Sequence, residues 1–161
     1  MSEIAIIDLE ASGLHFDSYP IEVALRWRGE IRQWLIRPEA AWLHWDEAAQ
    51  KLHGISRTQL LNEGTAARDV AQEINAAAHL CGGIFYSDNA PWDDDWLQTL
   101  FRAAGEIRLF HVLPLQETLP DPAAWKRFLA NKAELAGKYG AHRAALDVEM
   151  IWQAWRMAGA S

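Results

Sequence analysis

The spacing of apolar residues along much of the chain is typical of β-strands. Five apolar or alternating runs predict five strands, at residues 4–9, 20–28, 31–37, 82–87 and 106–113. A turn at Gly29–Glu30 joins the second run to the third, and Pro38 ends the resulting hairpin. The chain therefore begins with three strands that have no helix between them.

Elsewhere the apolar residues recur every three or four positions, as on one face of a helix. Five helices are predicted in this way, at 45–54, after Thr65, at 89–105, at 122–138 and at 141–158. Thr65 is expected to cap the second of them, and Gly54 and Gly105 to end the first and the third. The buried face of the second helix is predicted to hold Ala66, Val70, Ile74 and Ala77.

The order of these elements predicts the fold class. Antiparallel strands at the N-terminus, followed by strands that helices connect, produce a mixed sheet with helices on both faces. The sequence thus predicts an α/β protein with a five-stranded mixed sheet. Its 161 residues suit a single domain that spans residues 1–161.

Charge and composition narrow the possible functions. A net charge of −7 argues against a protein that grips long duplexes through their phosphates, and favours short or single-stranded nucleic acid. No apolar run approaches the ~20 residues of a membrane helix, so no membrane partner is expected. The N-terminus lacks a signal-peptide pattern, and the single cysteine, Cys81, allows no intramolecular disulfide. A cytoplasmic location is therefore predicted.

Nine tryptophans are unusual in a chain of this length. Most should lie in the core or at an interface, since that is the usual place of a large aromatic side chain. One or two could instead stack on the bases of a single strand. Because homodimers are the commonest oligomers, a homodimer is the prior expectation for an apolar interface.

Asp8 and Glu10 form the first candidate site, in the run IAIIDLEASGL. Residues two apart on a strand point the same way, so their carboxylates repel each other unless a cation lies between them. Hard oxygen ligands suit Mg²⁺ or Mn²⁺. Alternatively, Asp8 and Glu10 lie at an exposed strand end and their carboxylates are solvated, with no metal ion. Gly13 permits a tight turn and a close backbone approach to a ligand directly afterwards, and Leu14 could either wedge against a base or simply pack in the turn.

Asp93 belongs to a run of three aspartates at the start of a predicted helix. Acidic residues in a first turn complement the helix dipole, which could explain the run without a ligand. Asp88, just before the helix, is a further candidate. The residues alone leave the choice among these acids open.

His142 and Asp147 form the last candidate pair, in AHRAALDVEMI. If His142 lies just before the final helix or in its first turn, both side chains could face one cleft. A histidine can take a proton from water near neutral pH, although an isolated histidine is more often a capping or surface residue.

In combination, these motifs resemble the DEDDh family of 3′-to-5′ exonucleases, the DnaQ-like group within the ribonuclease-H-like fold. The resemblance covers about the whole chain. It rests on DLEASGL for the pattern DxExxGL, on Pro20-Ile21-Glu22, on His53-Gly54-Ile55, on DNAPWDDDWL for HNAxFDxxFL, and on HRAALD for HxAxxD. The histidine in the last motif marks the histidine branch of the family.

This chain departs from the family pattern in three places. Asp88 stands where the family usually has histidine, and Trp92 and Trp96 replace phenylalanines. Neither change is expected to affect the chemistry. The segment between the second and third motifs is short, and it often shapes the substrate channel, so the substrate class stays open.

The resemblance implies a role for each residue. Asp8, Glu10, Asp93 and Asp147 would hold two divalent ions, Mg²⁺ or Mn²⁺, and His142 would act as the general base on the attacking water. The product would be a nucleoside 5′-monophosphate released from the 3′ end of single-stranded DNA or RNA. The expected contacts to the terminal nucleotide are Ala11, Ser12, Leu14, His53 and Ile55.

Two other functions remain open. The chain could be a proofreading or processing subunit that needs a partner with a basic surface, or a catalytically silent nucleic-acid-binding module on the same fold. A transposase or integrase on the related fold is disfavoured by HRAALD. The sequence leaves the choice of DNA or RNA, the substrate length and the pathway undetermined.

Overall fold

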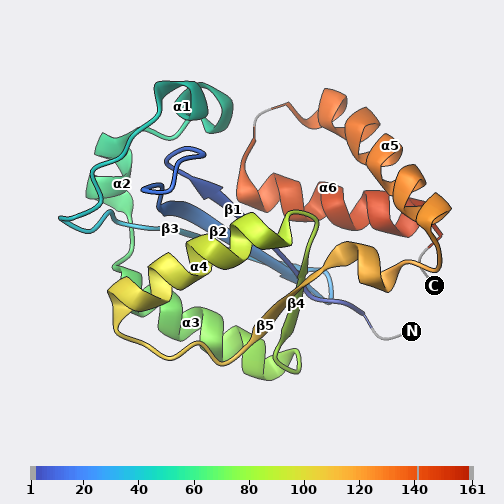
Figure 1. Ribbon diagram of the computed structural model, residues 1–161, viewed down its shortest axis with the longest axis horizontal. Coiled ribbons are helices and arrows are strands. Elements are labelled where there is room, and N and C mark those ends of the chain that lie inside the picture. Colours follow the sequence, from blue (N-terminus) through green and yellow to red (C-terminus); the bar gives the residue numbers. More distant parts are fainter. Residues whose placement is uncertain (1–2, 141, 160–161) are drawn as a thin grey trace.

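A computed structural model describes residues 3–140 and 142–159 of the chain. Its strands form one five-stranded sheet in the order β3-β2-β1-β4-β5 (Figure 1). The strands are β1 Ile6–Ala11, β2 Pro20–Trp27, β3 Glu30–Leu35, β4 Ile84–Ser87 and β5 His111–Pro114. β1 is antiparallel to β2, and β2 is antiparallel to β3, whereas β4 runs parallel to both β1 and β5. The predicted five-stranded mixed sheet is confirmed.

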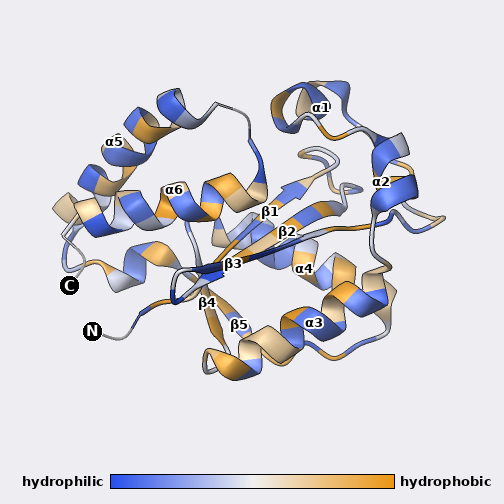
Figure 2. Cartoon of the chain, turned by 180° about the vertical axis from the view of Figure 1, so that it is seen from behind, coloured by the Kyte–Doolittle hydropathy of each residue, from blue (hydrophilic) through white to orange (hydrophobic). Residues whose placement is uncertain are grey.

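Helices cover both faces of this sheet, as predicted (Figure 1). The helices are α1 Glu47–His53, α2 Arg57–Glu63, α3 Ala67–Leu80, α4 Ala90–Ala104, α5 Pro122–Tyr139 and α6 Ala144–Met157, with a 3₁₀ helix η1 at Leu115–Thr118. One apolar cluster joins the sheet to α3 and α4, and a second joins it to α5 and α6. Figure 2 shows apolar residues concentrated between these layers, while much of the edge strand β3 is hydrophilic.

The alternation of side chains along β1 decides which face receives its acidic residues. Ile7 and Leu9 belong to the apolar cluster with α3 and α4, whereas Ile6 belongs to the cluster with α6. Because side chains two apart on a strand share a face, Asp8 and Glu10 lie on the same face as Ile6. The acidic pair is therefore directed toward the face that α6 covers.

The hairpin turn is one residue earlier than predicted. Arg28 and Gly29 both have positive φ, at 50° and 78°, and Trp27 pairs with Glu30 as the last register pair. Two residues with positive φ match the type I′ turn, whose twist fits a two-residue hairpin. Glu30 is consequently the first residue of β3, and the prediction of a Gly29–Glu30 turn is wrong.

Thr65 does not cap α3. The helix begins at Ala67 after Ala66, whose position carries no side-chain cap. The backbone of Thr65 instead pairs with the end of the hairpin: its N–H donates to the Leu35 carbonyl at 2.8 Å, and its carbonyl accepts from Arg37 at 2.8 Å. Tertiary pairing thus replaced the local capping interaction.

Two further differences concern the start of β5 and two short helices. Residues 106–110 are not part of β5, because the side chain of Asn75 binds this segment at the Ile107 carbonyl and the Leu109 N–H. The short helix α2 and the 3₁₀ helix were not predicted. Ser56 caps α2 by accepting from the N–H of Gln59, which is a recognisable local signal.

Within the described residues, none of the helices has the length and apolar character needed to cross a membrane.

Candidate functional site

The site begins with Asp8 and Glu10 on β1, the central strand of the sheet. Asp8 lies opposite Ala24 of β2, and Glu10 lies opposite Glu22. The register becomes irregular between Glu10 and Ala11, where the strand turns away into the loop before β2. Both carboxyl groups therefore stand near the C-terminal end of β1, on the face that α6 covers.

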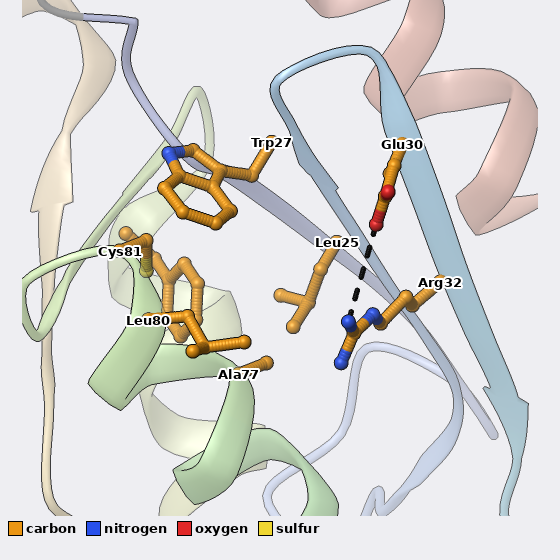
Figure 3. Close-up of a pocket in the computed structure, with 8 residues that line it drawn as sticks. Leu25, Trp27, Glu30, Arg32, Ala77, Leu80 and Cys81 are labelled. Atoms are coloured by element: carbon orange, nitrogen blue, oxygen red, sulfur yellow. Dashed lines mark ion pairs between the residues drawn. The ribbon is translucent and has the colours of Figure 1, made fainter.

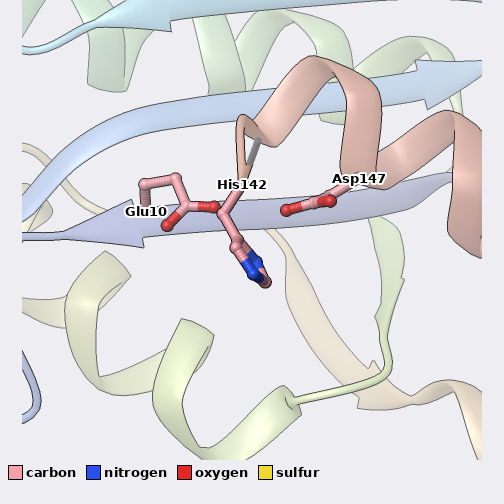
Figure 4. A group of neighbouring side chains, drawn as sticks. All are labelled: Glu10, His142 and Asp147. Atoms are coloured by element: carbon pink, nitrogen blue, oxygen red, sulfur yellow. The ribbon is translucent and has the colours of Figure 1, made fainter. Parts of the chain in front are cut away.

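The start of α6 brings two more groups to this place. Asp147 lies in the first turn of α6, and His142 lies two residues before the helix, in an exposed position. The backbone N–H of His142 donates to the Leu52 carbonyl at the end of α1, at 3.3 Å. One ligand atom each from Glu10, His142 and Asp147 lies within 4.8 Å of the others (Figure 4).

Asp93 approaches from the opposite side, in the first turn of α4. Its side chain is 1% exposed and accepts a hydrogen bond of 2.5 Å from Oγ of Ser87. The other two aspartates of the run have different surroundings: Asp94 pairs with Arg108 at 2.8 Å, and Asp95 is exposed. Burial thus distinguishes Asp93 from its neighbours in a way that the sequence could not.

Asp8 and Asp93 are not part of the three-residue group described above, but they share its electrostatic field. Burial, followed by repulsion from Asp93 and Asp147, raises the pKa of Asp8 well above its ordinary value. Its Oδ2 atom is buried and has no hydrogen-bond partner among the described residues. A buried carboxylate oxygen without a partner is costly unless something else satisfies it.

The pKa values of three other carboxyl groups are also raised. Burial, together with repulsion by Asp147 and a hydrogen bond that protonated Glu10 donates to Asp147, raises the pKa of Glu10 to about 9. Burial also raises the pKa of Asp93 to about 8, although hydrogen bonding to Ser87 opposes the shift. Burial likewise raises the pKa of Asp147, with partial compensation from Lys132 and His142.

These observations fit a divalent cation. The site offers carboxylate oxygens and an imidazole, holds an orphaned buried oxygen on Asp8, and concentrates negative charge where water is largely excluded. Hard oxygen donors suit Mg²⁺ or Mn²⁺. Asp8, Glu10, Asp93 and Asp147 are the residues that could hold such ions.

A buried carboxylate on β2 fixes the start of α6. Glu22 is 0% exposed and accepts from Nη2 of Arg143 at 2.7 Å and from the backbone N–H of Ala144 at 2.7 Å. Gln33 of β3 also donates to it, at 2.5 Å. The Ala144 N–H is one of the unpaired donors at a helix N-terminus, so Glu22 acts as a cap supplied by another element.

The residues expected to contact a terminal nucleotide are placed very differently from one another. Ser12 and Ile55 are completely buried, and Ile55 packs with Tyr19, Ile21 and Leu60. Ala11 is nearly buried. Leu14 is 71% exposed, so it is the one side chain of the predicted set that is open to a ligand over most of its surface.

His53 is nearly buried, yet its Nε2 atom has no hydrogen-bond partner among the described residues. Its Nδ1 accepts from the backbone N–H of Ile55 at 3.1 Å, so the proton of the neutral ring belongs on Nε2. Burial lowers the pKa of His53, which favours this neutral form. His53 therefore holds an unused donor beside Glu22, Arg143 and His142.

Contacts within the protein require a glycine at position 13. A Cβ atom at this position would lie 2.7 Å from Cε1 of His44 and 2.9 Å from Cβ of Asp46. The His44 ring also stacks on His15, with 4.9 Å between centroids, and braces the loop after β1. The close approach predicted at Gly13 is thus made by His44 and Asp46, whether or not a ligand also approaches there.

A groove lies beside this loop. It has a volume of about 580 Å³ and is lined by residues that include Phe16, Trp42, His44 and Arg102. An adjoining hollow shares Phe16 and Arg102 and adds His15 and Trp92. Phe16 is 87% exposed. This aromatic groove, defined by His15, Phe16, Trp42 and Trp92, reaches the residue that directly precedes Asp93.

A second, much smaller pocket lies between β2, β3 and the end of α3, in the helical layer that α3 and α4 form (Figure 3). It measures about 30 Å³ and is lined mainly by apolar side chains, with Glu30 and Arg32 paired at 4.0 Å at its edge. Cys81 lies in its wall, and burial raises the pKa of this thiol. A thiol with a raised pKa is a poor nucleophile, so this pocket offers no comparable chemistry.

Sequence reasoning missed three residues that shape the site. Glu22 was part of the motif Pro20-Ile21-Glu22 but was assigned no role. Its partner Arg143 lies inside HRAALD and was not assigned a role either. Lys132 of α5, which donates to Asp88, had no local signal at all, because its contact spans 44 positions of the chain.

No model of a protein family matches the chain, and no curated protein sequence is similar to it. Solved structures are similar in fold. E. coli Exonuclease I in complex with a 5cy-dA13 oligonucleotide superposes with a TM-score of 0.69 at 16% identity, over 95% of this chain and 39% of that one. The complex with a 5cy-dT13 oligonucleotide gives 0.71 at 15% identity, over 98% and 40%. The zinc-ion-bound form of an ExoI–ssDNA complex gives 0.70 at 14% identity, over 96% and 40%.

These similarities establish the fold. The chain has the α/β fold of the Exonuclease I structures, with a five-stranded mixed sheet and helices on both faces, which is the fold class predicted from the sequence. It spans about two fifths of the length of the Exonuclease I chains that it matches.

Replacing Glu22 by Gln should destabilise the protein by about 2 kcal/mol, the scale of hydrogen bonds to charged groups. Arg143, Ala144 and Gln33 all donate to Glu22, so the amide group of a glutamine would face a donor. Urea denaturation measures the effect. The control is Glu134→Gln, in an exposed pair with Lys138, which should change stability by less than about 0.5 kcal/mol. Equal effects in the two variants would contradict the role given to Glu22.

The metal-free protein should lose stability as the pH rises. Glu10 and Asp93 have pKa values of about 9 and about 8 in the folded protein, against about 4 in an unfolded chain. The folded state therefore binds more protons between these limits, and the free energy of unfolding falls as the pH increases from about 4 to 9. Melting temperatures in chelator should decrease over this range.

Two additions sharpen this test. Mn²⁺ should raise the melting temperature more at pH 8 than at pH 5, and Asp8→Asn should raise that of the metal-free protein at pH 8. Asp95→Asn, on the exposed side of α4, is the matched control and should leave the pH dependence unchanged. A metal-free protein that becomes more stable from pH 5 to pH 8 would refute the assignment of a repulsive acidic centre.

Proposed function

We propose that the chain is a metal-dependent 3′-5′ exonuclease domain of the DEDDh type, which removes nucleoside 5′-monophosphates from the 3′ end of single-stranded nucleic acid. The observation that carries the proposal is the convergence of Asp8, Glu10, Asp93, Asp147 and His142 from three parts of the chain. The ribonuclease-H-like fold, which the chain shares with an exonuclease crystallised with single-stranded DNA, supports it. All five residues lie in the one domain, residues 1–161.

Divalent ions, when bound, would stabilise the charge that develops on the phosphate and lower the pKa of an attacking water. Asp8, Glu10, Asp93 and Asp147 would hold these ions, and Mg²⁺ and Mn²⁺ both suit their oxygens. Burial and mutual repulsion supply the reason for these acids to bind a cation. Two ions are proposed because the donors come from opposite sides of the site, β1 and α6 on one side and α4 on the other.

His142 is the proposed general base. Its ring lies near Glu10 and Asp147, on an exposed segment that a substrate can reach (Figure 4). The imidazole nitrogen would take a proton from the attacking water as the bond to phosphorus forms. The leaving 3′ oxygen belongs to the shortened strand, so the released nucleotide keeps the phosphate at its 5′ position.

The terminal nucleotide would lie between the loop after β1 and the start of α4. Leu14 is exposed in that loop, and His53, whose Nε2 donor has no partner among the described residues, interacts electrostatically with His142. The backbone at Ala11 and Ser12 would contribute more than their buried side chains. The preceding bases would follow the aromatic groove, where stacking requires them to be unpaired.

The first test uses 5′-labelled single-stranded DNA and RNA of matched sequence, with Mg²⁺, Mn²⁺ or chelator. A ladder that shortens from the 3′ end only with metal is expected. The faster degradation of DNA or of RNA identifies the substrate class. Asp8→Asn should abolish the ladder without unfolding the protein, because a ligand is lost and no core side chain. His142→Ala should lower the rate at least ~100-fold, the usual scale for loss of a general base.

Glu134→Gln, in the exposed pair with Lys138 on α5, is the control and should keep full activity. A wild-type rate in Asp8→Asn or His142→Ala would refute the assignment of these residues. If the folded wild type binds metal but degrades no strand, the proposal of an independent nuclease fails. The partner-dependent subunit would then be favoured, since a chain with a net charge of −7 has little basic surface for gripping a phosphate backbone.

Phe16→Ala should raise the KM for single-stranded oligonucleotides about tenfold with little change in kcat, because base stacking on an aromatic ring is worth about 1–3 kcal/mol. The KM for a 4-nitrophenyl ester of thymidine monophosphate, which has no preceding bases, should be unaffected. Ile107→Ala is the control, since Ile107 is as exposed as Phe16 but lies outside the residues that line the groove. An unchanged KM for oligonucleotides would exclude stacking on Phe16.

A further inference from the structure

A partly buried ion pair interacts with the acidic centre. Nζ of Lys132, in the middle of α5, donates to Oδ2 of Asp88, which follows the last residue of β4. The side chain of Asp88 is 8% exposed and that of Lys132 is 31% exposed. The pair therefore joins two elements on different sides of the site, and water screens it poorly.

Both charges of this pair act on the candidate metal ligands. The negative charge of Asp88 repels Asp8, Asp93 and Asp147 and contributes to the raised pKa of each. The positive charge of Lys132 acts in the opposite direction on Asp93 and Asp147. The departure at position 88, which was expected to leave the chemistry untouched, thus adds a fifth carboxylate to the centre and a cation that offsets it.

Lys132 stays charged in this position. Burial alone would lower its pKa, but attraction to Asp88, followed by that to Asp8 and Asp147, outweighs burial and raises the pKa above its ordinary value. An ammonium group that remains protonated is a permanent charge of the site. Its field is present whether or not a metal ion is bound.

The attachment of α5 has other sources, so Lys132 is not required for it. Phe128 and Leu135 of α5 are buried in the apolar cluster with α6. Arg127 donates to the Ala158 carbonyl at 3.0 Å, and Asn131 donates to the Ala154 carbonyl at 3.4 Å. These contacts hold α5 against α6 along their length without any contribution from Lys132.

We propose that Asp88 and Lys132 form an internal charge pair that sets the affinity of the acidic centre for divalent cations. The inference rests on the metal site of the proposed function. Lys132 is a positioning residue in this role: its charge weakens the attraction of the carboxylates for a cation, and Asp88 strengthens it. The two residues together keep the centre close to the charge that its four proposed ligands would have alone.

Opposite shifts are expected when each charge is removed by itself. Lys132→Met should tighten Mn²⁺ binding roughly three- to tenfold, because an uncompensated Asp88 adds negative charge at short range. Asp88→Asn should weaken Mn²⁺ binding by a similar factor, because Lys132 is then unopposed. The double variant should return to near the wild-type affinity, and Lys132→Arg should match the wild type throughout. Calorimetric titration with Mn²⁺ measures all five proteins without any need for turnover.

The pattern of signs separates this role from a structural one. If the pair were a purely structural contact, both single variants would change the Mn²⁺ affinity in the same direction. The double variant would then not restore the affinity of the wild type. Melting curves in chelator verify that each variant is folded, and Lys132→Arg supplies a folded comparison in which the charge is kept. Equal Mn²⁺ affinity in all variants would overturn the inference alone. A wild type that takes up no Mn²⁺ would overturn the proposed metal site and the inference together.

Discussion

The contact between Glu22 and the start of α6 is the constraint on which the arrangement of the site depends. Glu22 stands on β2 directly opposite Glu10 of β1, and it accepts from Arg143 and from the Ala144 N–H. The first turn of α6 is therefore fixed across the end of the sheet that carries the acidic pair. Asp147 and His142 follow from this placement, one in that turn and the other just before it. A single buried carboxylate thus links the sheet to the groups contributed by the C-terminal helix.

The negative charges of this region fall into two classes. Glu22 and Asp88 are compensated, by Arg143 and Lys132 respectively. Asp8, Glu10 and Asp93 have no cationic side chain in direct contact among the described residues, and their pKa values are raised as a result of burial and repulsion. Buried charges are stable only when they are paired, protonated or bound to metal. The acids that brace the site have cationic side-chain partners, whereas the acids of the centre require protonation or a bound cation to be stable.

Local pattern was sufficient for the elements but not for all their boundaries. Strand alternation placed Asp8 and Glu10 on one face, and glycines with left-handed φ ended α1 and α4 at Gly54 and Gly105, because these features depend on neighbouring residues alone. Thr65 does not cap α3 as predicted, because its backbone pairs with the end of the hairpin. Residues 106–110 do not form the predicted part of a strand, because the side chain of Asn75, about 30 positions earlier, binds their backbone.

The sequence by itself determined which residue types could perform the chemistry and on which elements they would lie. Only the tertiary structure decided which acid of the run Asp93–Asp95 turns inward, because that depends on burial against β1 and on the hydroxyl of Ser87. It also decided that Ile55 is a core residue while Leu14 and Phe16 are open to solvent. The pairing of Asp88 with Lys132 was likewise decided only by the tertiary structure. Packing brings such groups together over long sequence separations, and periodicity and motif spacing carry no record of contacts at that range.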